Sequence, residues 1–219
     1  MFDSIDFPDP REGEEDGLFA IGGDLSPQRL LLAYSMGAFP WFSFRDSSEP
    51  LWYCPMKRFV IFPDEIHISH STRNLINKKI YTCSINKAFD RVIRGCASKR
   101  IDMPGAWLGN EMIEAYTTLH KMGLAASVEV WKGDILVGGL YGVTLNSAFF
   151  GESMFSSEPG VSKLALIHLA RTMAGNGGSL IDCQFETPHL KSMGGRIIDY
   201  EEYMRIIHIP TWLPKINNK

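Results

Sequence analysis

The chain has 219 residues and a net charge of −3, with 45% apolar and 21% charged residues. This composition is typical of a globular protein and excludes a disordered or collagen-like chain. The sequence has no run of about 18 apolar residues that could span a bilayer, and no basic and apolar leader at its start, so we expect a cytoplasmic protein. None of the cysteines forms a Cys-x-x-Cys pair, so we expect neither a zinc site nor disulfides.

The first 65 residues predict a small, aromatic-rich α/β unit. Residues 1–24 carry eight acids and one base, and their first part resembles an extended arm. Ser26 is a typical helix N-cap, because Pro27 follows at the first helical position, and the helix is expected to end near Gly37. Two aromatic turns and a strand are expected next, over 39–42, 51–55 and 58–62.

Residues 66–219 predict a second unit with a different order of elements. The expected elements are a strand at 81–85, helices at 87–98 and 111–122, strands at 127–131, 135–143 and 147–150, a helix from 162 to 175, a strand at 179–184, a short helix ending near 194 and a last helix opened by Asp199. Three closely spaced strands favour antiparallel pairing, whereas the helix between the strands at 147 and 179 requires a parallel crossover. The order resembles the GCN5-related N-acetyltransferase fold, an α+β fold with a mixed, mostly antiparallel sheet.

The helix at 87–98 separates apolar and basic residues onto opposite faces. Its apolar positions recur at the spacing of one buried stripe, and Asn86 is expected to cap the N-terminus of the helix. Lys87, Arg91 and Arg94 share the other face, within a segment (71–100) that holds eight bases and one acid. This pattern favours phosphate binding, with a merely solvated basic face as the alternative. The flanking basic residues are Lys78, Lys79, Lys99 and Arg100.

Three polar residues near strand ends are candidate site residues. Asp182 and Gln184 are separated by one residue, so they should point to the same face of an apolar strand. They need either a cavity or polar partners. Glu152 follows a strand between Gly151 and Ser153, where it could hold an amine; the alternative is an exposed loop residue.

Several motifs in order resemble the leucyl/phenylalanyl-tRNA–protein transferase family, over about residues 5 to 208. They lie at 17–27, 37–42, 137–143, 151–156 and 180–184. The resemblance implies an enzyme of the N-degron pathway. Such an enzyme moves leucine or phenylalanine, with methionine as a further candidate, from charged tRNA onto proteins that begin with Lys or Arg, and so marks them for degradation. It implies no cofactor and no metal, and we expect a monomer.

The chemistry of such a transfer, from an ester onto an α-amine, indicates roles for individual residues. Gln184 would orient the attacking amine, Asp182 would fix the amide of Gln184, and Glu152 would bind a cationic group. Weaker candidates for stacking on the terminal adenine of tRNA are Trp107 and Tyr116. The resemblance implies an aminoacyl pocket, and the alternative is that its residues are ordinary core. The candidate pocket residues are Leu140, Phe149, Met154, Leu169 and Met173.

Two other functions remain open at this point. One is a small-molecule N-acyltransferase of the same fold, although residues 157–161 lack the glycine-spaced loop that coenzyme A needs, and Glu158 would repel a pyrophosphate. The other is a tRNA-binding module without catalysis.

Overall fold

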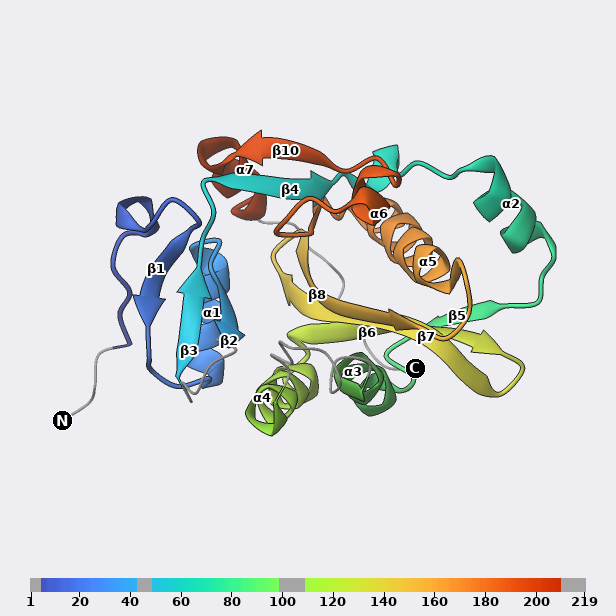
Figure 1. Ribbon diagram of the computed structural model, residues 1–219, viewed down its shortest axis with the longest axis horizontal. Coiled ribbons are helices and arrows are strands. Elements are labelled where there is room, and N and C mark those ends of the chain that lie inside the picture. The colour runs from blue at the N-terminus through green and yellow to red at the C-terminus, as the bar shows by residue number, and fades with distance from the viewer. Residues whose placement is uncertain (1–4, 43–48, 99–108, 210–219) are drawn as a thin grey trace.

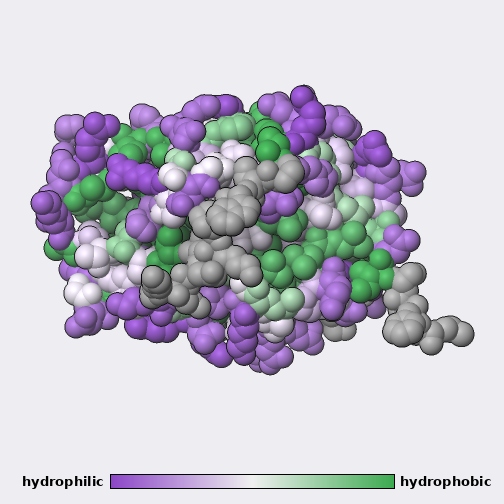
Figure 2. Space-filling view, turned by 180° about the vertical axis from the view of Figure 1, so that it is seen from behind, coloured by the Kyte–Doolittle hydropathy of each residue, from purple (hydrophilic) through white to green (hydrophobic). Residues whose placement is uncertain are grey.

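The computed structural model describes residues 5–42, 49–98 and 109–209, and these form two β-sheets with helices packed around them (Figure 1). A three-stranded antiparallel sheet lies near the N-terminus, and a seven-stranded sheet occupies most of the molecule. From behind, hydrophilic residues dominate the outline of the molecule and hydrophobic residues show between them (Figure 2). Within the described residues, no helix is both long and apolar enough to cross a bilayer.

The small sheet has the order β1 (Leu18–Ile21), β3 (Pro50–Tyr53), β2 (Phe39–Phe42), and α1 (Pro27–Ser35) precedes β2. The predicted cap is confirmed, because the Ser26 side chain accepts the Arg29 N–H. The two predicted aromatic turns are wrong, since these residues pair as strands. Pro40 is compatible with a strand because β2 lies at the sheet edge, where a missing N–H breaks no ladder.

The large sheet is mixed and mostly antiparallel, as predicted. Among the strands of the described residues, only β8 and β9 pair in parallel, and the crossover between them is α5 (Val161–Gly175). In sheet order the strands are β10 (Arg196–Asp199), β4 (Lys57–Ile61), β9 (Leu180–Asp182), β8 (Ala148–Ser156), β7 (Ile135–Leu145), β6 (Ala125–Lys132) and β5 (Thr82–Ile85). The sequence did not predict β10. The division of the chain at residue 65 stays a prediction, and sheet pairing joins β4 to the second unit.

Helices cover both faces of the large sheet (Figure 1). On one side lie α3 (Phe89–Ser98) and α4 (Asn110–Lys121), and on the other lies α5. A separate hydrophobic core fills each side. The remaining helices are η1 (Pro10–Glu12), η2 (Pro63–Glu65), α2 (His70–Asn77), which was not predicted, α6 (Pro188–Lys191) and α7 (Tyr200–Ile207).

The predicted helix cap at Asn86 is wrong, and Asp199 is the N-cap residue of α7 as predicted but without the capping side-chain bond. Asn86 has a left-handed backbone (φ 57°), and its side chain accepts the Ser127 N–H. The N–H groups of Lys87 and Ala88, just before α3, instead donate to Glu129, a buried carboxylate on β6. Asp199 precedes α7, but its side chain makes no capping hydrogen bond. The sequence pattern located these helices, and tertiary contacts decided what satisfies their ends.

Candidate active site

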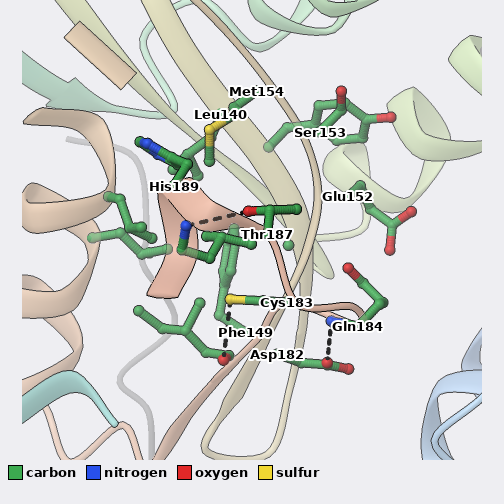
Figure 3. Close-up of a pocket in the computed structure, with 16 residues that line it drawn as sticks. Leu140, Phe149, Glu152, Ser153, Met154, Asp182, Cys183, Gln184, Thr187 and His189 are labelled. Atoms are coloured by element: carbon green, nitrogen blue, oxygen red, sulfur yellow. Dashed lines mark hydrogen bonds between the residues drawn. The ribbon is translucent and has the colours of Figure 1, made fainter. Parts of the chain in front are cut away.

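A cavity of about 220 Å³ opens beside the large sheet, between β7, β8 and β9, α5 and the segment leading into α6 (Figure 3). Its wall is mostly apolar. It includes four of the five predicted pocket residues, namely Leu140, Phe149, Met154 and Leu169. The sequence analysis missed three further apolar side chains of this wall, which are Leu166, Ile181 and Leu190. Met173 does not line the cavity, because it is buried in the core against Gly178.

The three predicted polar residues all line this same cavity. The parallel register of β8 and β9 explains why, because it pairs Phe150 with Asp182. Glu152 and Gln184 each lie two residues beyond that pair, so both arrive at one end of the cavity, as their labels show in Figure 3. One end of an apolar pocket therefore carries a carboxylate and an amide.

Glu152 lies at a β-bulge. Tyr141 pairs with Ser153 and Gly142 with Gly151, so Glu152 is the extra residue on β8. The bulge reverses the alternation of side chains: Phe149 and Met154 pack into the same core although an odd number of positions separates them. Bulges of this kind re-aim side chains. Here the bulge turns Glu152 toward α1 and α4.

Two buried tyrosine hydroxyls hold the Glu152 carboxylate. Tyr34 donates to Oε1 at 2.7 Å and Tyr116 to Oε2 at 2.9 Å, and the two hydroxyls are 2.6 Å apart. Burial raises the pKa of Glu152 to about 7, although both hydrogen bonds act to lower it. Burial, reinforced by the charge of Glu152, also raises the pKa of both tyrosines well above its usual range, so they stay neutral donors. Glu152 therefore changes charge near neutral pH.

The predicted stacking role of Tyr116 is wrong. Its side chain is fully buried, and its ring packs edge-on against Tyr141, so no base could reach it. Tyr116 instead supports Glu152, together with Tyr34, which the sequence analysis missed. Trp107, the other stacking candidate, lies outside the described residues.

Asp182 is fully buried in an ion pair with Arg58 on β4. The Arg58 Nε and Nη2 atoms lie 2.9 and 2.7 Å from the two Asp182 oxygens. Burial by itself would lower the pKa of Arg58, but the Asp182 carboxylate raises it above its usual range. The sequence analysis missed Arg58, although a cation beside the apolar run of β4 and an anion at the end of the apolar strand β9 are a readable signal for a buried pair.

Gln184 is held through its backbone. The strand β9 ends at Asp182, so the predicted shared strand face of Asp182 and Gln184 is wrong. Gln184 has a left-handed backbone (φ 57°), and its N–H donates to Asp182 Oδ1 at 2.9 Å. Asp182 thus fixes the Gln184 main chain, whereas the sequence analysis expected it to fix the side-chain amide.

The basic residues occupy more than one part of the surface. Lys87, Arg91 and Arg94 are exposed, as predicted, with Arg91 and Arg94 on α3 and Lys87 two residues before it. Lys87 and Arg91 each lie 5.2 Å from the centre of the Trp131 ring. Lys78 and Lys79 are also exposed, but they follow α2, which packs against α5, across the sheet from α3 (Figure 1). Lys99 and Arg100 lie outside the described residues.

Comparison with known proteins gives a consistent result over most of the chain. A family described as leucyl/phenylalanyl-tRNA protein transferase matches residues 60–208, and its N-terminal domain matches residues 23–56. Proteins of that name from Flavobacterium psychrophilum and Nitrosomonas eutropha are 50% and 45% identical to this chain, covering 93% and 100% of it and 96% and 94% of their own lengths. Among solved structures, L-PGS from Bacillus licheniformis matches with a TM-score of 0.49 and 11% identity, over 83% of this chain and 70% of that one.

Loss of the Asp182 carboxylate should destabilise the fold. Asp182→Ala leaves the guanidinium of Arg58 buried without its counter-ion, so we expect the free energy of unfolding to fall by about 3–5 kcal/mol. Urea denaturation measures this loss. The matched control is Glu186→Ala, which removes an exposed ion pair with Lys191 and should cost less than about 1 kcal/mol. Equal stability of the two variants would contradict the assigned role of the pair.

Proposed function

Because the chain belongs to the leucyl/phenylalanyl-tRNA protein transferase family and is an aminoacyltransferase, we propose that it moves leucine or phenylalanine from charged tRNA onto the N-terminal α-amine of acceptor proteins that begin with Lys or Arg. One observation carries this proposal: an apolar cavity ends where Glu152 and Gln184 meet. Methionine as a donor, marking of the product for degradation, a cytoplasmic location and a monomeric state stay predictions.

The apolar part of the cavity suits the side chain of the donor amino acid. Leu140, Phe149 and Leu169 line this part of the cavity and offer hydrophobic contact without a charged group. A leucine or phenylalanine side chain placed there leaves its ester carbonyl toward the polar end. Burial of such a side chain contributes roughly 1.5–3 kcal/mol to donor binding.

The reaction needs positioning more than a strong base. The acceptor amine attacks the ester carbonyl carbon, an amide bond forms, and the ester C–O bond breaks as the terminal ribose hydroxyl of the tRNA leaves. An α-amine has a pKa of about 7.7–8.0, so a fair fraction is neutral near pH 7. The Gln184 amide oxygen can accept a hydrogen bond from that amine and aim it. Such orientation can lower the free-energy barrier of the reaction by about 7–11 kcal/mol.

Glu152 supplies the negative charge at this end of the cavity. We infer that its carboxylate holds a cationic group of the acceptor. Burial disfavours the charged form of Glu152, and an amine or guanidinium beside it would stabilise that form. Tyr34 and Tyr116 fix the direction of its oxygens.

The exposed face of α3 is the proposed contact for the tRNA backbone. Lys87 and Arg91 pack on the Trp131 ring, so their side chains are already partly ordered and lose less conformational entropy on binding. Each phosphate that they neutralise would release counterions.

Removal of the Gln184 amide should slow the chemical step. We expect Gln184→Ala to reduce the single-turnover rate of transfer to an Arg-starting peptide by about 100-fold or more, with charged-tRNA affinity nearly intact, because the proposed phosphate contacts lie on α3. Glu186→Ala, two residues away and outside the cavity lining, is the matched control and should transfer at the normal rate. A normal rate for Gln184→Ala would rule out the proposed mechanism.

Acceptor binding should depend on pH through Glu152. Its pKa is raised to about 7, so the carboxylate is charged above that pH and becomes neutral as the pH falls through it. The KM for an Arg-starting peptide, measured with saturating charged tRNA from pH 6 to 8.5, should therefore rise below about pH 7. Glu152→Gln should raise the KM at pH 8 and remove this dependence. A KM that keeps the same pH profile in Glu152→Gln would argue against the assignment.

Charge reversal on α3 should weaken tRNA binding. We expect the double variant Arg91→Glu, Arg94→Glu to bind leucyl-tRNA and phenylalanyl-tRNA more weakly by a similar factor. The slope of log affinity against log salt concentration should become shallower by about one unit for each lost contact. The control is the pair Arg73→Glu and Arg171→Glu, exposed bases on α2 and α5 across the sheet. If both pairs weaken binding equally, the contact is not specific to α3.

A further inference from the structure

Asp182 links Gln184 to two residues that lie far from it in the sequence. Arg58 on β4 and Tyr203 on α7 both donate hydrogen bonds to its carboxylate. We propose that Tyr203, together with Arg58, is a positioning residue for Gln184 that acts through Asp182, so that the docking of α7 sets the rate of transfer. This inference rests on the proposed role of Gln184 in orienting the amine.

Asp182 has no free oxygen with which to act on a substrate. Its Oδ1 accepts hydrogen bonds from Arg58 Nε and the Gln184 N–H, and its Oδ2 accepts from Arg58 Nη2 and the Tyr203 hydroxyl. Its side chain is fully buried. A carboxylate surrounded in this way holds its donors in place relative to one another, because each donor binds along one lone-pair direction of an oxygen.

Gln184 needs such support because its backbone is unfavourable for a residue with a side chain. Its φ of 57° lies in the left-handed region, where the Cβ crowds the following carbonyl. Two hydrogen bonds keep it there, one from its N–H to Asp182 Oδ1 and one to its carbonyl from the Phe59 N–H of β4. If the Asp182 carboxylate turns, the first of these bonds is lost and the Gln184 side chain moves with its backbone.

Tyr203 is placed to prevent that turn. Its hydroxyl lies 2.8 Å from Asp182 Oδ2, and its ring and the Phe39 ring lie 4.9 and 4.8 Å from the Arg58 guanidinium. The ring is fully buried, and Gly37 leaves room for it, since a Cβ at Gly37 would come within 2.7 Å of Tyr203 Cε1. The tyrosine therefore orients both members of the ion pair.

The test compares two tyrosines on the same helix. Tyr203→Phe removes the hydroxyl that reaches Asp182, whereas Tyr200→Phe removes a hydroxyl that donates to the backbone oxygen of Met36, 3.1 Å away, without contact to Asp182. With saturating charged tRNA and an Arg-starting peptide, we expect Tyr203→Phe to lower the single-turnover rate about tenfold at unchanged KM for either substrate. Tyr200→Phe should transfer at the normal rate. A normal rate for Tyr203→Phe overturns the inference.

A double-mutant cycle separates positioning from a general loss of structure. Because Tyr203 acts through Gln184, Tyr203→Phe should slow the wild-type protein but add no further loss in a Gln184→Ala background. Additive losses would mean that Tyr203 acts by another route and would overturn the inference. A normal rate for Gln184→Ala alone would instead refute the proposed mechanism, which distinguishes the two failures. Tyr203→Phe should melt below Tyr200→Phe, because a buried carboxylate loses a donor, but it should stay folded at the assay temperature. A loss of rate that appears only where Tyr203→Phe begins to unfold counts against positioning.

Discussion

The buried ion pair between Arg58 and Asp182 is the contact on which the arrangement of this site depends. It joins two neighbouring strands of the large sheet, β4 and β9, at the point where β9 ends. Taking two charges out of water is costly, and the cost is offset only where geometry and further hydrogen bonds are good. The Tyr203 hydroxyl and the Gln184 N–H supply those bonds, so the pair also ties α7 and the turn after β9 to the sheet.

A second constraint acts from the neighbouring strand. The bulge on β8 turns Glu152 toward Tyr34 and Tyr116, whose side chains belong to the core on the opposite face of the sheet from α5. Because β8 and β9 run parallel, the two polar groups arrive at the same end of the apolar cavity. The proposed pocket for the donor side chain and the proposed polar end for the acceptor amine therefore belong to one cavity.

The proposed tRNA contact has a buried support of its own. Glu129 accepts the N–H groups of Lys87 and Ala88 and a hydrogen bond from Ser84, and Ser84 in turn accepts the Trp131 indole N–H. The indole lies under Lys87 and Arg91. A buried carboxylate thus orients the start of the basic helix, while the bases themselves remain exposed. The proposed tRNA contact and the proposed reaction site are thus supported by separate polar networks on different strands.

The sequence by itself determined the mixed sheet, the single parallel pair and most of the helices, because those depend on local periodicity and on the order of elements along the chain. It also identified Glu152, Asp182 and Gln184, and four apolar residues of the cavity wall. Only the tertiary structure decided how these residues are held there. It placed Tyr116 beneath Glu152 with no exposed face, removed Met173 from the cavity, and showed that Asp182 holds the Gln184 backbone. Arg58 and Tyr203 lie 124 and 21 residues from Asp182 along the chain, and no local pattern can specify contacts that exist only after β4, β9 and α7 have packed together.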